Sequence, residues 1–284
     1  METRRLGRTE HHSSVAVLGA AAFWASTPSV VSECLDAALA AGVNHLDIAP
    51  QYGQAERLVG PFLPAVRDKL FVGCKTMRKN GDGVRAQLEE SLSILGCEQF
   101  DLYQLHAVTS VAGLDERADA AAAVLRARDE GLTRFVGITG HDVGTLAAQA
   151  EALRRYDFDT VMFPVAPRLW ALDSYRRDAE ALLSLAAARD VGVMAIKAAS
   201  ARPKPADSDA TTWYEPYRTE AEIARGVRFA LSVEGVHGFC TPGDVRLLPL
   251  ALSAAEQFTP MGPDERAEAT DAVRSEALIF PMPA

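Results

Sequence analysis

Short apolar segments alternate with longer segments rich in alanine, leucine and charged residues, eight times along the chain. The short segments are typical of buried parallel strands, and the long ones of helices. Right-handed connections place helices outside a parallel sheet, and eight strands close around an interior that side chains fill. The alternation therefore predicts a (β/α)₈ TIM barrel. The expected strands are 15–19, 43–48, 69–75, 100–106, 133–139, 159–164, 192–197 and 236–240.

The helices expected between these strands complete eight repeats. They are 29–41, 54–66, 82–95, 116–130, 142–155, 174–189, 219–232 and 243–257. Outside the repeat, residues 1–12 are expected to form a small hairpin or plug, and 263–276 an added C-terminal helix. A length of 284 residues would allow two domains. The unbroken alternation instead favours one barrel domain, 1–284.

The composition narrows the possible partners. There are 38 acidic residues against 29 lysines and arginines, and the net charge of -9 disfavours binding to a nucleic-acid backbone. No stretch approaches the ~18 apolar residues that span a bilayer, and no signal peptide is evident. The four cysteines are widely spread, which is typical of free thiols in a reducing compartment. We therefore expect a cytoplasmic protein that binds a small molecule; its oligomeric state is left open.

Polar side chains stand at or just behind the ends of three consecutive predicted strands. Asp47 ends the second strand within LDIAPQYG, and Tyr52 follows it; Lys75 ends the third strand and His106 the fourth. Because the carboxyl ends of barrel strands share one mouth, these groups are expected to converge. Any one of them alone is more often a structural group, whereas the set together favours function. No metal site is expected, because His11-His12 has no second pair at ligand spacing.

The converging groups suit a proton donor together with charged neighbours that adjust its pKa. A phenol has a pKa near ~10, and an adjacent ammonium lowers this pKa by favouring the phenolate, as Lys75 could do for Tyr52. Asp47 would balance the buried ammonium, and His106 would hydrogen-bond a substrate oxygen or relay the proton. Tyr52 is thus predicted to be a general acid for an oxygen that gains negative charge.

These residues resemble the aldo/keto reductase family, whose barrels use an Asp, Tyr, Lys and His tetrad. The resemblance runs over essentially the whole chain, and its segments are RRLGRTEHHSSVAVLG, GVNHLDIAPQYG, FVGCKT, FDLYQLHA and FVGITGH. It implies hydride transfer from NADPH, or less often NADH, to an aldehyde or ketone, which becomes an alcohol. It further implies that Tyr52 is the general acid, that Asp47 and Lys75 tune it, and that His106 orients the substrate.

The resemblance also implies positions around the cofactor. Thr139 keeps a hydroxyl where the family usually has Ser-Asn for the carboxamide, and Met162 stands in the strand that usually supplies a Gln. Lys197 could neutralise a cofactor phosphate; the other interpretation is a counter-ion for an acidic neighbour. Thr241 and Arg246 keep the spacing used around an adenosine 2′-phosphate, which favours NADPH, although TPGD can also simply cap a helix.

Large aromatic side chains are candidates for the walls of the substrate pocket. Trp24, Trp170 and Trp213 are expected there beside His106. The irregular segment 198–217 is expected to cover the site, because the chain is short for this family and leaves little for a C-terminal lid. A merely mobile surface loop is an equally good interpretation of that segment.

Two other functions stay open. A Schiff-base aldolase on the same barrel could use Lys75 or Lys197 as its nucleophile. A barrel that binds nucleotide without turnover could act as a sensor or partner subunit. The identity of the carbonyl substrate is not encoded, because the loops that would select it vary freely on this fold.

Overall fold

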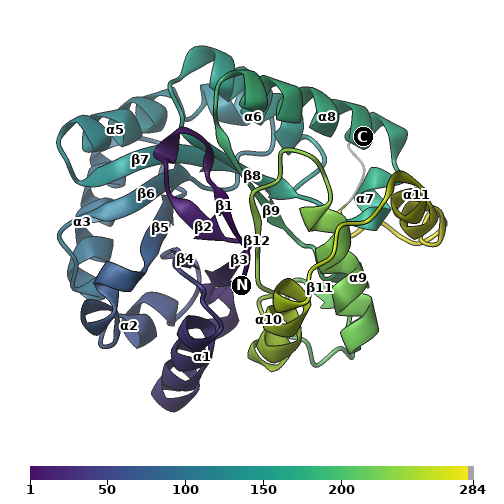
Figure 1. Ribbon diagram of the computed structural model, residues 1–284. Helices are drawn as coiled ribbons and strands as arrows, with labels where there is room; N and C mark the ends of the chain where they lie inside the picture. The colour runs from purple at the N-terminus through teal and green to yellow at the C-terminus, as the bar shows by residue number, and fades with distance from the viewer. Residues whose placement is uncertain (281–284) are drawn as a thin grey trace.

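A closed barrel of eight parallel strands forms the centre of the molecule, and helices surround it (Figure 1). The computed structural model describes residues 1–280. The barrel strands are β3 (Ala16–Gly19), β4 (His45–Asp47), β5 (Phe71–Thr76), β6 (Phe100–Leu105), β7 (Thr133–Thr139), β8 (Thr160–Pro164), β9 (Gly192–Ile196) and β12 (Gly238–Cys240). β12 pairs with both β9 and β3 and so closes the barrel. The predicted (β/α)₈ TIM barrel is confirmed, and Thr76 is the one strand residue outside its expected segment.

Helices occupy the connections between the strands, as expected. They are α1 (Pro28–Ala40), α2 (Ala55–Val59), α3 (Gly81–Leu95), α5 (Ala118–Asp129), α6 (Thr145–Arg155), α8 (Asp173–Ala188), α9 (Glu220–Leu231) and α10 (Leu248–Glu256). At α1, α3 and α9 the sequence sets the start through a side chain that accepts a free amide. Thr219 and Glu222 form a reciprocal capping box at α9, and Asn80 accepts from Gly83 at α3.

Some helix predictions are wrong in extent. The segment 54–66 is not one helix, because Pro61 has no N–H to continue α2, and only a 3₁₀ turn at Leu63–Ala65 follows. The last repeat begins with a 3₁₀ turn at Val245–Leu247, so its helix starts later than expected. Two short helices were not predicted, α4 (Val111–Asp115) and α7 (Pro167–Trp170).

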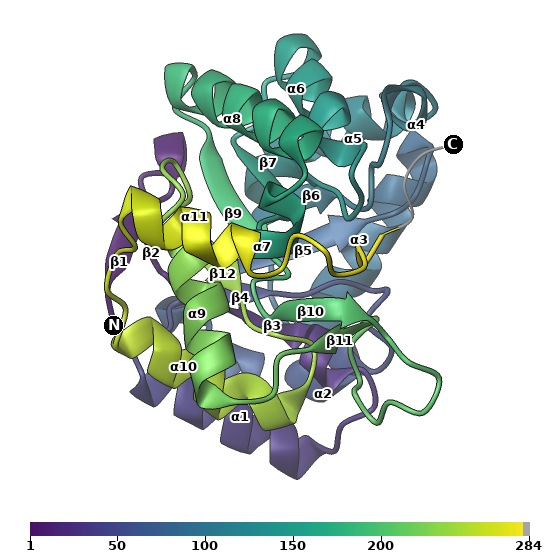
Figure 2. The same ribbon diagram turned by 90° about the vertical axis from the view of Figure 1, so that its right-hand side faces the viewer.

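Three segments lie outside the repeat. β1 (Thr3–Arg5) and β2 (His12–Ser14) form the expected antiparallel hairpin. α11 (Pro263–Asp271) is the added helix, shorter than predicted. The segment 198–217 is not irregular throughout, because β10 (Ser200–Pro203) pairs antiparallel with β11 (Tyr214–Pro216). Figure 2 shows this hairpin and the segment after α11 on the same side of the molecule.

Side chains alternate between the barrel interior and the surrounding helices, because successive residues of a strand point to opposite faces. On β8, Val161 and Phe163 pack in the large core toward the helices, whereas Met162 lies in a smaller cluster inside the barrel. That cluster also contains Phe71 and Leu102. No helix among residues 1–280 is long and apolar enough to cross a membrane.

Candidate active site

The same alternation directs polar side chains to the mouth of the barrel. Phe71 on β5 and Leu102 on β6 both point into the barrel. Lys75 lies four positions after Phe71, and His106 lies four positions after Leu102, just beyond the end of β6. Because alternate residues of a strand share a face, Lys75 and His106 point the same way as these two apolar residues. Asp47 ends β4, the neighbouring strand. Three successive strands therefore bring these polar groups to one mouth, where all three side chains are buried.

Lys75 forms hydrogen bonds in three directions. Its Nζ donates to Asp47 Oδ2 at 2.5 Å, to Tyr52 OH at 3.2 Å and to Ile48 O at 3.4 Å. An ammonium has three donors, and all three are used here. Since the phenol oxygen of Tyr52 accepts a hydrogen bond from Lys75, its own hydrogen is directed elsewhere.

Burial and charge together set the protonation of this group. Burial would lower the pKa of Lys75, but Asp47 and Tyr52 outweigh it and hold that pKa above its ordinary value. Burial raises the pKa of Tyr52, and the Lys75 ammonium only partly opposes the rise. The expectation of a lowered Tyr52 pKa is therefore wrong for the net shift, because burial is the larger effect. At neutral pH Lys75 is charged and Tyr52 holds its proton.

His106 contacts a second histidine. Its Nε2 lies 3.1 Å from His141 Nε2, and its Nδ1 lies 3.2 Å from Gln51 Oε1. Burial lowers the pKa of both imidazoles, that of His141 to about 3, so both rings are neutral. With Gln51 Oε1 as acceptor, the His106 proton sits on Nδ1 and His141 Nε2 donates to His106. His141 Nδ1 then carries a lone pair, and this buried atom has no hydrogen-bond partner among the described residues.

His141 is a site residue that our sequence prediction omitted. It stands two residues beyond the end of β7, and its side chain lines the cavities at the mouth. The rule that singled out Lys75 and His106, a polar residue just behind a buried apolar run, also applies to it.

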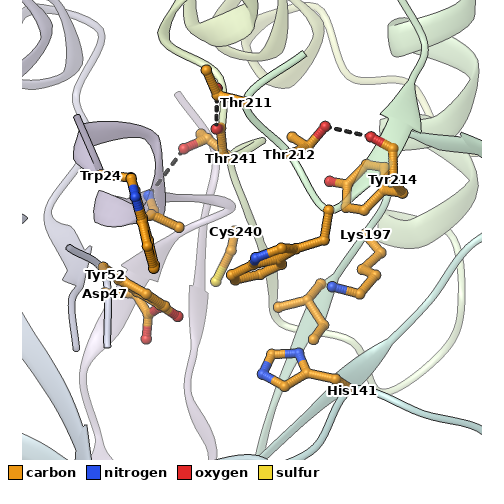
Figure 3. Close-up of a pocket in the computed structure, with 15 residues that line it drawn as sticks. Trp24, Asp47, Tyr52, His141, Lys197, Thr211, Thr212, Tyr214, Cys240 and Thr241 are labelled. Atoms are coloured by element: carbon orange, nitrogen blue, oxygen red, sulfur yellow. Dashed lines mark hydrogen bonds between the residues drawn. The ribbon is translucent and has the colours of Figure 1, made fainter. Parts of the chain in front are cut away.

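A cavity of about 780 Å³ opens between the ends of β3, β9 and β12 and the β10–β11 hairpin. In Figure 3, Trp24, Asp47 and Tyr52 lie on one side of it, and Tyr214, Lys197 and His141 on the other. Thr211, Thr212 and Thr241 add hydroxyl groups to the lining; we call this the first cavity.

A second cavity of about 740 Å³ adjoins the first. Its side chains are mostly apolar or aromatic, apart from the polar groups around Tyr52 and His106. The two cavities share Tyr52, His141, Lys197, Trp213 and Tyr214. Ile279 and Phe280 also line it, so the C-terminal segment contributes to the cover of the mouth beside segment 198–217, which was expected to cover the site.

Lys197 reaches both cavities through an unusual backbone. Ile196 points into the barrel, so a continued strand would turn Lys197 toward the helices. Its φ of 66° is left-handed and ends the strand, and the side chain lines the mouth. No carboxylate among the described residues pairs with its ammonium, which lies 5.2 Å from the ring centroids of Trp213 and Tyr214 and 5.7 Å from that of Phe280. The alternative of a counter-ion for an acidic neighbour is therefore wrong.

Only one of the other predicted cofactor residues lines the first cavity. Thr241 lines the first cavity, where its Oγ1 accepts a hydrogen bond from Gly19 N at 2.9 Å. Thr139 is fully buried and lines neither cavity. The prediction that Met162 binds the cofactor is wrong, because strand alternation places this side chain in the barrel interior. Arg246 lies outside the first cavity and is ion-paired with Asp244 and Asp209.

Two of the three tryptophans predicted in the substrate pocket line the cavities, and one does not. Trp24 lines the first cavity, and Trp213, 60% exposed, lines both. Trp170 is 7% exposed and contacts neither cavity; its ring packs against Tyr175 and Phe229 in the helical layer. Its assignment to the pocket is corrected, because α7 turns this side chain into the core. Within residues 1–280, no group of three or more His, Cys, Asp or Glu could hold a metal ion.

Comparison with known proteins identifies the barrel. The model of the aldo/keto reductase family matches residues 16–201, well over half of the chain. The chain belongs to this family. An uncharacterized oxidoreductase of Bacillus subtilis is 28% identical over 153 residues, which cover 49% of this aldo/keto reductase and 49% of that protein. The chain therefore matches about half the length of this curated relative.

Two further relatives bear on cofactor and fold. An NAD/NADP-dependent indole-3-acetaldehyde reductase of Schizosaccharomyces pombe is 46% identical over 72 residues, 24% of this chain and 25% of that protein. The holo form of an aldo-keto reductase from Bacillus halodurans superposes with a TM-score of 0.75 at 20% identity and covers 98% of both chains. The structural likeness shows a shared fold over the full barrel.

Proposed function

We propose that this aldo/keto reductase reduces an aldehyde or ketone to an alcohol with a reduced nicotinamide dinucleotide, and that Tyr52 donates the proton. The observation that carries the proposal is the bonding of Lys75. Its ammonium is held by Asp47 and donates to the Tyr52 oxygen. The phenol hydrogen is then free to be donated to a ligand in the cavities, both of which Tyr52 lines.

The electrostatics of this arrangement suit an acid that releases its proton only during the reaction. Before the reaction, burial keeps Tyr52 protonated. When a carbonyl oxygen gains negative charge, it takes the phenol proton, and the Lys75 hydrogen bond stabilises the phenolate that remains. Asp47 keeps Lys75 charged throughout, so the positive charge is in place before the proton moves.

His106 and His141 line the site beside Tyr52 rather than supply the proton in this proposal. Both imidazoles are neutral, and the His106 Nε2 lone pair accepts the hydrogen bond of His141. The Tyr52 and His106 rings meet edge-on, with centroids 5.8 Å apart. His106 thus forms a wall beside the phenol, and the lone pair of His141 Nδ1 can accept an N–H or O–H of a ligand.

The first cavity fits the cofactor in charge and shape. Asp47 Oδ1 is buried without a partner in the described part of the chain, and a ribose hydroxyl would satisfy it. The unpaired Lys197 ammonium complements a phosphate, and Thr211 and Thr241 offer hydroxyl groups beside it. When bound, the cofactor would supply the hydride that the carbonyl carbon receives. The family uses such cofactors, and the name of the Schizosaccharomyces pombe relative includes both NAD and NADP.

The second cavity suits an apolar or aromatic carbonyl compound. Met77, Phe280, Ile279 and Trp213 form much of its lining, which offers few partners for the many hydroxyls of a sugar. We therefore propose aromatic aldehydes as the substrate class to test first.

The test is loss of reduced-nicotinamide absorbance with benzaldehyde in the wild type and in Tyr52→Phe. The variant removes only the phenol oxygen, and we expect turnover to fall by about 10²- to 10⁴-fold while nucleotide binding persists. Turnover that stays within about threefold of wild type would exclude Tyr52 as the acid. Nucleotide binding without oxidation by any of a panel of carbonyl compounds would favour the sensor or partner subunit.

The two lysines differ in whether they could act as the nucleophile of a Schiff-base aldolase. Lys75 keeps its proton because of Asp47, so it lacks the lone pair of a nucleophile. Lys197 is the remaining candidate, since burial lowers its pKa to about 8. Borohydride trapping of benzaldehyde on Lys197 would support the aldolase chemistry; the reductase proposal predicts no trapped adduct.

A further inference from the structure

The guanidinium of Arg246 is already occupied by two carboxylates. Its Nε donates to Asp244 Oδ1 at 2.9 Å, and its Nη2 donates to Asp244 Oδ2 at 2.7 Å. Nη1 donates to Asp209 Oδ2 at 2.6 Å, and Nη2 donates also to the Asp209 carbonyl at 3.0 Å. Four of the five N–H donors of Arg246 are therefore in use. The residue predicted to bind a 2′-phosphate has one donor left.

The neighbouring charged side chains are paired with one another. Arg218 binds Asp209 at 2.7 Å and Glu215 at 2.8 Å, which extends the cluster along the hairpin. Two arginines thus stand among three carboxylates. Hydrogen bonds from Arg246 and Arg218 hold the pKa of Asp209 below its ordinary value, so this carboxyl is ionised at neutral pH. A phosphate dianion entering here would meet carboxylates and guanidinium groups that are already paired with each other.

This cluster borders the end of the first cavity away from Tyr52. Thr211 and Gly243 line that cavity, and Thr211 Oγ1 donates to Gly243 O at 2.7 Å. The amide of Thr211 also donates to Asp244 Oδ2 at 3.3 Å. A dinucleotide whose reactive ring lies beside Tyr52 and whose other end extends past Thr211 and Gly243 would approach Asp209 and Asp244.

We propose that Asp209 and Asp244 make this enzyme select NADH over NADPH. Carboxylates accept hydrogen bonds from the 2′- and 3′-hydroxyls of an adenosine ribose, whereas a 2′-phosphate requires a free cation. Here the Arg246 cation is paired with both carboxylates, and Asp244 contacts Thr211 in the lining of the first cavity. The inference rests on the proposed use of a nicotinamide dinucleotide, and it opposes the NADPH preference that Thr241 and Arg246 predicted from the sequence.

The experiment is a pair of equilibrium titrations, of NADH and of NADPH, followed by the fluorescence of the tryptophans. Trp24 and Trp213 line the first cavity and would report binding. We expect NADH to bind wild type at least about tenfold more tightly than NADPH. In Asp209→Asn, which removes a charge and the carboxylate bound to Arg246 Nη1 while the pair with Asp244 stays, NADPH should bind about tenfold more tightly than to wild type, with NADH changed by less than about threefold.

Asp271→Asn is the matched control. Asp271 is as exposed as Asp209 and pairs with Arg274, but it ends α11, and neither residue of the pair lines a cavity. It should leave both affinities unchanged. Arg246→Ala gives a second measurement: NADPH affinity should fall by less than about threefold, because the guanidinium is engaged elsewhere. A loss of about tenfold or more would show that Arg246 holds the phosphate and overturn the inference.

Tighter binding of NADPH than of NADH by wild type would also overturn it, while leaving carbonyl reduction intact. Failure of both nucleotides to bind would instead remove the proposed function itself. Equal NADPH affinity in wild type and Asp209→Asn would contradict the role given to Asp209.

Discussion

The two sides of the barrel mouth differ in how far their polar groups are satisfied. The inner group, Asp47, Tyr52, Lys75 and His106, is buried, and hydrogen bonds already link Lys75 to Asp47 and Tyr52. The outer rim, Lys197, Thr211 and Trp213, comes from the end of β9 and the hairpin. Trp213 is largely exposed, and Lys197 has no counter-charge among the described residues.

This difference separates chemistry from binding. Strands fix the inner group before any ligand arrives, so the charge next to Tyr52 needs no rearrangement during the reaction. The rim gains its missing partner, an anion for Lys197, only from a ligand. Substitutions in the inner group should therefore reduce both stability and turnover. Substitutions in the rim should reduce only the affinity for ligands.

The largest expected effect is on stability, in Lys75→Met. Removing the ammonium leaves Asp47 buried with no counter-charge, which costs about 3–5 kcal/mol in the free energy of unfolding. Urea unfolding measures this loss, and the double variant Lys75→Met/Asp47→Asn should recover most of it without recovering turnover. A loss below about 1 kcal/mol in the single variant would mean that the pair does not hold the inner group together.

Lys197→Met should weaken binding of the reduced dinucleotide by about tenfold without lowering stability, because it removes an unpaired buried cation. Burial lowers the pKa of Lys197 to about 8. The affinity of wild type should therefore fall as the pH rises through 8. The free protein should gain stability from about pH 8 upward, since the unfolded chain binds that proton more tightly.

Titrations and urea curves at several pH values measure both slopes. The control is Lys79→Met, which removes an exposed lysine that is paired with Glu116 and lines neither cavity. An affinity that does not change across pH 8 in wild type would contradict the assignment of Lys197 to the phosphate.

The smallest expected effect on the function of the site is that of Trp213→Ala, and Trp170→Ala is its comparison. Trp213→Ala should raise the KM for benzaldehyde several-fold with little change in stability, because its ring is exposed and lines both cavities. Trp170→Ala should cost about 3–5 kcal/mol of stability with an unchanged KM, because its ring is buried in the helical layer. The reverse pattern would restore Trp170 to the pocket. Steady-state kinetics and urea unfolding of both variants decide this.

The barrel and the placement of the inner group could be predicted because both follow from the period of the strands. A buried strand fixes the direction of every second side chain, so Lys75 at the end of an apolar run has little choice of position. The fold and the convergence of Asp47, Lys75 and His106 were therefore readable from the chain.

The rim could not be predicted in the same way, because loops carry no such period. Pairing of β10 with β11 joins residues more than ten positions apart, and only this pairing brings Asp209 to Arg246. The left-handed backbone at Lys197 reverses the direction that alternation would give its side chain. The prediction that Met162 binds the cofactor was wrong for a different reason. Strand alternation was enough to place this side chain inside the barrel, and the prediction did not apply it.

The measurement that tests the central claim most directly is transfer of deuterium from C4 of a labelled reduced nicotinamide dinucleotide to benzaldehyde. Mass spectrometry of the alcohol reports whether the label has reached the carbonyl carbon. The account predicts singly deuterated benzyl alcohol with wild type and a rate lower by about 10²-fold or more with Tyr52→Phe. Unlabelled alcohol, or equal rates in the two proteins, would contradict it.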